Sequence, residues 1–306
     1  MTSKGKIPVN KISVIAAIGE VLWDLFPDGR KLGGAPFNVV CNARELGAKG
    51  AMVSRIGDDD LGKEILAAVK EKGVDSRYVT ADINYPTGTV SVLLDENGKP
   101  DFTIHKNVAW DFISWDDSMK PLAASCDAVV FGSLAQRSPV TRETIRRFLK
   151  SVPKNNCLRV FDINLRQSFY SKDIVHESLE FADILKINDD ELPVVSNLFN
   201  IKGNTTDIME RLINEYSLRL VALTRGSKGS LLVRNCETSD HPGLKVNVVD
   251  TVGAGDAFTA AMTVSVLKGK SLDEINNNAN RLAAFVCTQR GALPPIPDSI
   301  KSLFYS

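Results

Sequence analysis

The 306-residue sequence has no excess of charge of either sign, because Lys plus Arg and Asp plus Glu both number 37. It also has no long basic run, and both absences argue against nucleic acid or an anionic membrane surface as a partner. The apolar stretch 12–18 is far shorter than the roughly 18 residues of a membrane span. It continues into further patterned sequence, which favours a core strand over a signal peptide. We therefore expect a cytoplasmic protein that binds small molecules.

Cysteine is scarce and scattered along the chain. No two of the five cysteines form a CxxC pair, so the sequence signals neither a zinc site nor a disulfide framework. We expect small buried hydrophobic residues at all five positions, which are Cys41, Cys126, Cys157, Cys236 and Cys287.

Two glycine motifs of nucleotide-binding proteins are missing. The dinucleotide fingerprint GxGxxG fails after Gly253, because Phe258 stands where its third glycine should be. Residues 57–63 have the GxxxxGK spacing of a Walker P-loop, but Glu64 replaces the Ser or Thr and three carboxylates would face the phosphates. The sequence therefore disfavours a dehydrogenase and a P-loop enzyme.

Alternating apolar strands and amphipathic helices are what the sequence does contain. Unbroken apolar strands indicate a parallel sheet that is covered on both faces. Helical patterns separate them, for example at 141–150 and 204–216. No repeat, low-complexity tract or long linker divides the chain, so we predict one doubly wound α/β domain over residues 1–306. The predicted strands are 12–18, 51–56, 128–131, 158–163, 184–187 and 218–223.

The stretch 246–262 organises the rest of the chain. A β-branched run at 246–250 predicts a strand, and a turn with Gly253 and Gly255 then leads into an amphipathic helix. The turn suits an anion, because small residues expose backbone N–H groups and a helix N-terminus carries about half a positive charge. Asp256 is either an ordinary acid of a first helical turn or a base that takes a proton from a hydroxyl beside a bound phosphate.

Residues 250–261 resemble the C-terminal signature of the PfkB, or ribokinase-like, carbohydrate kinases, and the resemblance extends along nearly the whole chain. The segments 86–88 (PTG), 109–111 (AWD) and 131–137 are similar to the fructokinase branch. This resemblance implies a three-layer α/β/α fold with a small β-sheet lid, and ATP-dependent phosphorylation of a sugar hydroxyl. It also implies the catalytic residues, namely Asp256 as the base, Arg166 beside the phosphoryl group, and the N–H groups of Gly253, Ala254 and Gly255.

Two segments, 19–33 and 86–112, interrupt the alternating pattern. Each contains a predicted hairpin, the second around the turn Asp95–Gly98. They could be ordinary edge hairpins of the main sheet. The resemblance instead implies a lid over the sugar, which in the family often pairs with a second subunit to give a homodimer.

Several polar residues are candidates for holding the sugar. Asp24 is either a solvated acid or an acceptor for two neighbouring sugar hydroxyls. Arg137 is either a surface charge or a substrate ligand, and Phe102 is either a core residue or part of the lid. The substrate-binding set that the resemblance implies is Asp24, Gly33, Gly34 and Asn38 (the last three as GGxxxN), Phe102, Arg137 and Asp256.

The remaining motifs lie after predicted strands, where open α/β sheets collect their ligands. Arg166 of DxNxR has a forked set of donors that suits phosphate. Asn188 and Glu191 fit a capping box, and equally the family's NxxE motif, which orders Mg²⁺ through waters. The segment with Thr224, Gly226 and Gly229 and the segment with Asn280 also match the family. A hairpin turn explains the first match equally well, and a buried helix explains the second. The resemblance places Asn188, Thr224, Gly226, Gly229, Gly253, Gly255 and Asn280 beside ATP, and Asp250 beside a monovalent cation such as K⁺.

The sequence therefore predicts a fructokinase that uses MgATP and fructose to form fructose 6-phosphate. Ribose, a nucleoside, 2-keto-3-deoxygluconate or a sugar phosphate remain alternative acceptors, because lid geometry decides the acceptor. A catalytically silent sugar or nucleotide sensor is disfavoured, because Asp256 and the glycine turn are both present.

Overall fold

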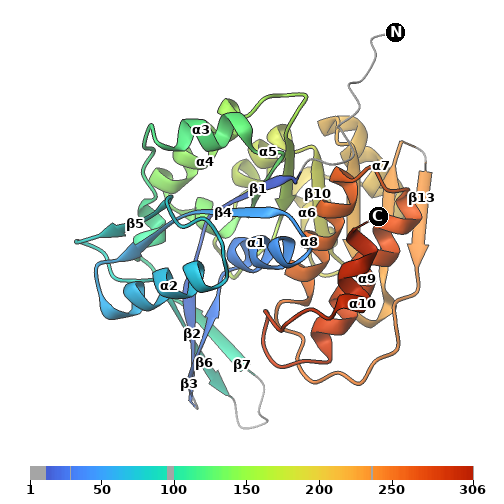
Figure 1. Ribbon diagram of the computed structural model, residues 1–306. Helices are drawn as coiled ribbons and strands as arrows, with labels where there is room; N and C mark the ends of the chain where they lie inside the picture. Colours follow the sequence, from blue (N-terminus) through green and yellow to red (C-terminus); the bar gives the residue numbers. More distant parts are fainter. Residues whose placement is uncertain (1–11, 28, 95–99, 236, 306) are drawn as a thin grey trace.

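A nine-stranded sheet forms the middle layer of the protein (Figure 1). The computed structural model describes residues 12–27, 29–94, 100–235 and 237–305, without the side chains of 92–94 and 100–102. The strands of this sheet are β1 Val14–Ile18, β4 Lys49–Gly57, β5 Val79–Asp82, β8 Ala128–Phe131, β9 Leu158–Asp162, β10 Ile184–Asn188, β11 Leu220–Thr224, β12 Ser230–Arg234 and β13 Glu237–His241. Their order is β13-β12-β11-β10-β9-β8-β1-β4-β5, parallel from β11 to β5 and antiparallel at β12 and β13.

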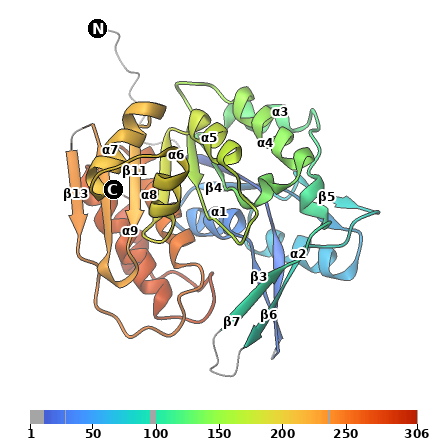
Figure 2. The same cartoon turned by 180° about the vertical axis from the view of Figure 1, so that it is seen from behind.

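Helices cover both faces of this sheet, as Figures 1 and 2 show from opposite sides. The helices are α1 Ala35–Glu45, α2 Asp60–Glu71, α3 Met119–Ser125, α4 Pro139–Ser151, α5 Lys172–Phe181, α6 Glu191–Phe199, α7 Thr205–Tyr216, α8 Ala254–Leu267, α9 Leu272–Cys287 and α10 Asp298–Lys301. Helices α3 to α7 share one buried apolar cluster with the sheet, whereas α1, α2, α8, α9 and α10 pack on the other face. Within the described part of the chain, no helix is long and apolar enough to cross a bilayer.

The apolar strands form the middle layer, between the two layers of helices, because the side chains on both of their faces are buried. In β1, Ile15 and Ala17 face one helical layer, whereas Ala16 and Ile18 face the other, and all four are fully buried. Side chains alternate along a strand, so a central parallel strand must be apolar throughout. All six predicted strands are present with ends within two residues of the prediction, and the predicted doubly wound three-layer α/β/α fold is confirmed.

A second, four-stranded sheet projects from the edge of the three layers (Figures 1 and 2). Its strands are β2 Leu22–Phe26, β3 Gly29–Gly33, β6 Thr89–Leu94 and β7 Pro100–Ile104, in the order β3-β2-β6-β7. The antiparallel pairs β2–β3 and β6–β7 confirm both predicted hairpins. The predicted turn Asp95–Gly98 lies outside the described residues.

The strand predicted at 246–250 is wrong. The segment 242–250 has no strand, and Val248 and Val249 are 62% and 57% exposed. Its backbone has few partners: Val249 N–H and Asp250 N–H both donate to the Cys287 carbonyl, at 2.8 Å and 3.3 Å, and Gly243 N–H donates to His241 Nδ1 at 3.0 Å. Strand preference reflects packing against neighbouring strands, and here the chain has already left the sheet after β13. The segment instead runs along the rim of the cavity described next.

Candidate active site

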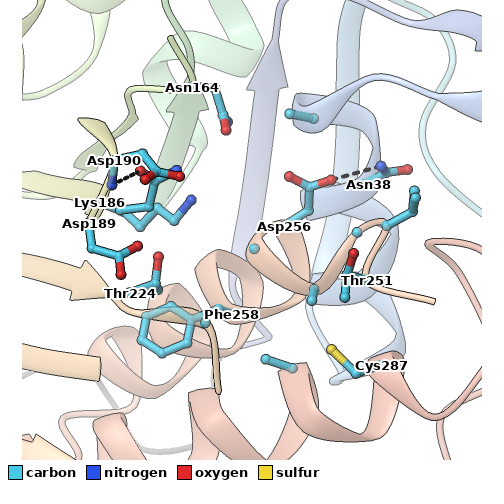
Figure 3. A pocket seen from close by; sticks show the side chains of 18 of the residues that line it. Asn38, Asn164, Lys186, Asp189, Asp190, Thr224, Thr251, Asp256, Phe258 and Cys287 are labelled. Atoms are coloured by element: carbon cyan, nitrogen blue, oxygen red, sulfur yellow. Dashed lines mark hydrogen bonds between the residues drawn. The ribbon is translucent and has the colours of Figure 1, made fainter. Parts of the chain in front are cut away.

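A cavity of about 1180 Å³ opens at the carboxyl ends of the central strands, between the main sheet and the four-stranded sheet. Open parallel sheets bind ligands at this edge. Most predicted site residues line the cavity, and several are visible in Figure 3. Those that do are Asp24, Gly34, Asn38, Arg166, Asn188, Thr224, Gly226, Gly229, Gly253, Ala254, Gly255, Asp256 and Asn280.

The glycine turn before α8 can exist only with glycine at its first position. Gly253 is the N-cap of α8 and has a left-handed backbone with φ of +78°. A Cβ added to Gly253 would collide with the Cβ and Cα of Ala292. The turn therefore brings the N-terminus of α8 to the cavity, a place that suits an anion, although the Ala254 N–H also donates to the Thr251 carbonyl at 3.3 Å.

Asp256 does not act as a helix cap. Its Oδ2 accepts a hydrogen bond from Asn38 Nδ2 of α1 at 2.8 Å (Figure 3), and α8 has no side-chain cap. Burial, followed by the charge of Asp162, raises the pKa of Asp256 to about 6, although Asn38, Lys186 and Arg166 act in the opposite direction. The carboxyl group is therefore mostly ionised at neutral pH and poised to accept a proton.

The four-stranded sheet contributes one wall of the cavity. Leu22, Val90 and Ile104 supply apolar surface, and Asp24 supplies a carboxylate whose burial raises its pKa to about 6. Gly33 lies behind this wall, where a Cβ would meet Asp24 Oδ2 at 2.5 Å. Gly33 therefore makes room for Asp24. The side chain of Phe102, the other predicted contact here, lies outside the described residues.

Arg137 is not among the residues that line the cavity, and its contact with a substrate stays a prediction. Its guanidinium lies 4.0 Å and 4.6 Å from the ring centres of Trp110 and Phe169. Its Nε is 2.7 Å from Asp111 Oδ1, and both side chains of this ion pair are buried. A buried charge needs such a partner, so Arg137 ties residues beside the four-stranded sheet to the core.

Asn188 and Glu191 form the reciprocal bonds of the predicted capping box, but α6 begins at Glu191 with Asp190 as its N-cap, so the bonds close the turn before the helix. Glu191 N–H donates to Asn188 Oδ1 at 2.8 Å, and Asn188 N–H donates to Glu191 Oε2 at 3.0 Å. Glu191 Oε1 also accepts from Leu165 N–H at 2.9 Å. Glu191 is only 4% exposed and lies behind the cavity wall. It therefore fixes the loop that carries Arg166 next to the turn at Asn188.

At the far end of the cavity, the β11–β12 turn contributes Thr224, Gly226 and Gly229. Gly229 has a φ of +77°, and a Cβ there would clash with the His241 carbonyl. Asn280 of α9 also lines this end, but its Nδ2 donates to Ser230 Oγ at 2.7 Å. Part of its hydrogen-bonding capacity is therefore used to hold β12.

Asp250 lies behind the cavity wall and joins two backbone segments. Its carboxylate accepts from Val252 N–H and from Gly291 N–H, both at 3.0 Å. Lys31 Nζ of β3 is 3.8 Å from its Oδ2. These bonds hold the glycine turn against the loop after α9.

The cavity also contains charged residues that were not predicted from the sequence, namely Glu20, Lys186, Asp189, Asp190 and Lys245. Glu20 follows β1 directly, is 3% exposed, and has its pKa raised to about 7 by burial. Lys186 lies within β10 and is also 3% exposed. A charge inside an otherwise apolar strand was the available signal for Lys186, and the Glu in GExLxD was the signal for Glu20.

The chain is similar to several kinases along nearly its whole length. A family model described as pfkB family carbohydrate kinase matches residues 28–299. A Pyrococcus horikoshii protein described as an uncharacterized sugar kinase is 32% identical, with 91% of each chain covered. Its structure in complex with ATP aligns with a TM-score of 0.78, at 32% identity, over 93% of this chain and 96% of that one.

Two fructokinases are also similar. That of Klebsiella pneumoniae is 29% identical, covering 92% of this chain and 96% of the relative. The fold is shared with a Vibrio cholerae fructokinase double mutant, at 23% identity and a TM-score of 0.80 over 96% of this chain and 98% of that one. The latter structure is described as the fructose, ADP and potassium ion bound form.

Proposed function

The chain belongs to the pfkB family of carbohydrate kinases, and from this premise we propose that it is a fructokinase that converts ATP and fructose into ADP and fructose 6-phosphate. The observation that carries the proposal is the position of Asp256. Its carboxylate is held by Asn38 in a cavity that also contains the anion-binding turn 253–255.

In the proposed reaction, a sugar hydroxyl oxygen forms a bond to the γ-phosphorus while the bond from that phosphorus to the β,γ-bridging oxygen breaks. The hydroxyl proton passes to the Asp256 carboxylate. The N–H groups of residues 253–255 and the guanidinium of Arg166 stabilise the negative charge on the moving phosphoryl group. These residues all line the same cavity.

Mg²⁺, when bound with the nucleotide, would supply positive charge that offsets the crowded phosphates. Glu191 and Asn188 fit a role in holding it through waters. Asn188 lines the cavity and would face the ion, whereas Glu191 lies behind the wall and would orient Asn188, from whose N–H it accepts a hydrogen bond. A potassium ion beside Asp250 would have to share that carboxylate with Lys31, and we assign no step to it.

We propose that the four-stranded sheet, within approximately 19–33 and 86–112, acts as a lid. Its apolar residues Leu22, Val90 and Ile104 face the cavity and would keep water away from the reacting phosphate.

The acceptor side of the cavity favours an uncharged sugar with several hydroxyls. Glu20, Asp24 and Asp256 place three carboxyl groups there, with Asn38, and carboxylates accept hydrogen bonds from hydroxyls. The negative charges of Asp24 and Asp256 would repel an acceptor that carries a carboxylate or a phosphate, and Glu20, whose pKa burial raises to about 7, would add to this in part. Fructose meets this requirement, and the relative from Klebsiella pneumoniae is a fructokinase.

A coupled ADP assay over free sugars, nucleosides, 2-keto-3-deoxygluconate and sugar phosphates tests the specificity. We expect the highest kcat/KM with fructose. Turnover of ribose, a nucleoside or an acidic sugar with fructose inert would contradict the fructokinase proposal but not the kinase chemistry. Tight ATP and sugar binding without ADP formation from any acceptor would identify a sensor.

We also propose a homodimer that forms through the lid. Strands β3 and β7 are the two edges of the four-stranded sheet, and an unpaired strand edge can add strands of another chain. Light scattering should give a molar mass near twice that of the 33.4 kDa chain. The mass of a single chain at micromolar concentration would contradict this.

A further inference from the structure

Lys186 is a buried cation in the floor of the cavity. It lies on β10 directly opposite Asp162 of β9 in the parallel ladder. Its Nζ is 3.0 Å from Asp162 Oδ1, and the two side chains are 4% and 3% exposed. Lys186 lines the cavity, and Figure 3 shows its amine directed into it on the side where Asp256 lies.

The amine of Lys186 lies next to the anion-binding turn. A Cβ added at Gly255 would be 3.3 Å from Lys186 Nζ. Asp162 is itself fixed from the helix that begins at this turn, because Thr259 Oγ1 of α8 donates to Asp162 Oδ2 at 2.6 Å. The ion pair therefore has a set position relative to residues 253–255, and its cation is close to the place that suits a phosphate.

The ammonium group keeps its proton. Burial by itself would lower the pKa of Lys186, but the negative charges of Asp162, Glu191 and Asp256 outweigh burial and raise the pKa above its ordinary value. Lys186 thus lies among three acids, which hold it in its charged form. An arriving phosphoryl group meets a full positive charge there only at Lys186 and Arg166, among the described residues that face Asp256.

We propose that Lys186 is a further catalytic residue, whose ammonium group contacts the phosphoryl group in transit beside the backbone N–H groups of residues 253–255. This inference rests on the proposed phosphoryl transfer. The ion pair with Asp162 does not by itself explain why position 186 carries a lysine. A buried ion pair costs desolvation free energy that an apolar pair of similar size would avoid. A preorganised charge beside the transferring group is instead a large source of rate enhancement.

Two variants separate the catalytic role from a purely structural one. Lys186→Met and Asp162→Asn both remove the same ion pair, so both should lower the melting temperature. Lys186→Met should reduce kcat by about 10² to 10³, the usual effect of losing one stabilising donor at such a site, with the sugar KM nearly unchanged. Asp162→Asn keeps the cation and should reduce kcat far less. Lys186→Gln carries the same test if Lys186→Met does not fold.

The pH profile gives a second readout with opposite signs for the two variants. Charged groups that face Asp256 are Glu20, Asp24, Asp162, Lys186 and Arg166. The wild-type kcat/KM should fall as the pH drops through about 6, where Asp256 takes up a proton. Lys186 lowers the pKa of Asp256 and Asp162 raises it. The acid limb should therefore move to higher pH in Lys186→Met and to lower pH in Asp162→Asn.

Equal losses of kcat in both variants with an unmoved acid limb would overturn the inference and leave Lys186 a structural residue. Near-native kcat in a folded Lys186→Met or Lys186→Gln would also overturn it. Binding supplies a further check by calorimetry. Loss of Lys186 should lower the affinity for the non-hydrolysable ATP analogue AMP-PNP more than the affinity for ADP, because the proposed contact is to the terminal phosphoryl group. A wild-type protein that forms no ADP with any sugar would instead refute the proposed function itself.

Discussion

Asp256→Asn is expected to lower kcat by about 10² to 10⁴, the usual contribution of a general base, and to leave sugar affinity nearly intact. The amide cannot take the hydroxyl proton, but its oxygen can still accept the hydrogen bond that Asn38 Nδ2 donates to Asp256 Oδ2 at 2.8 Å. The geometry of the cavity is therefore kept while the base is lost. Steady-state kinetics with fructose and ATP measure kcat, and calorimetry measures sugar binding.

The matched control is Asp173→Asn, which removes an exposed acid from the first turn of α5. Both variants replace an acid in the first turn of a helix by its amide, but only Asp256 faces the cavity. Near-native turnover of Asp256→Asn would refute its role as the base.

The Asp256→Asn variant should lose turnover without losing thermal stability. The pKa of Asp256 is raised in the folded protein from 3.8 to about 6, so the folded state holds this proton more tightly than the unfolded state does. The ionised group therefore costs stability, and this cost grows as the pH rises from about 4 through about 6. The melting temperature of Asp256→Asn at neutral pH should equal or exceed that of the wild type.

Gly253→Ala is expected to lower kcat by about 10² to 10³, comparable to the loss of a donor at an oxyanion site. The new Cβ would collide with Ala292, and the left-handed backbone at φ of +78° disfavours any side chain. The turn can relieve the clash only by moving the N–H groups of residues 253–255 away from the phosphate. Turnover, together with the affinity for ADP, measures this displacement.

Gly269→Ala separates backbone strain from the clash. Gly269 follows α8 with a φ of +70°, nothing lies within 4 Å of an added Cβ, and the residue does not line the cavity. A left-handed non-glycine residue costs about 1–3 kcal/mol, so both variants should melt at lower temperature. Only Gly253→Ala should lose turnover, and an equal loss in Gly269→Ala would mean that general destabilisation causes the effect.

The sequence predicted the regular elements well because their signals are local. An apolar run such as Leu220–Thr224 fits only a strand with two covered faces, and Asn204 with Asp207 marks the start of α7 through reciprocal bonds. The strand predicted at 246–250 was wrong because a local preference is not enough without a tertiary partner. Its valines have a strand preference, but no neighbouring strand is present to pair with them.

The candidate site was predictable in part. The glycine turn and Asp256 stood out because glycine and an acid at a helix start carry a recognisable chemistry. The surroundings of Arg137 were not predictable, because the sequence does not show that its charge pairs with Asp111, 26 residues earlier. Lys186 was not predicted, because a charge inside an apolar strand signals a special residue but its role depends on the groups that pack around it.

The sequence by itself determined the order of strands and helices, the anion-binding turn before α8 and the acid that follows it, since each depends on residues adjacent along the chain. Only the tertiary structure decided which groups share the cavity. It brings Asn38 to Asp256 across 218 residues, and it sets Lys186 beside Gly255. It also gave Asp256 its raised pKa, because burial and neighbouring charges act through space and not along the chain.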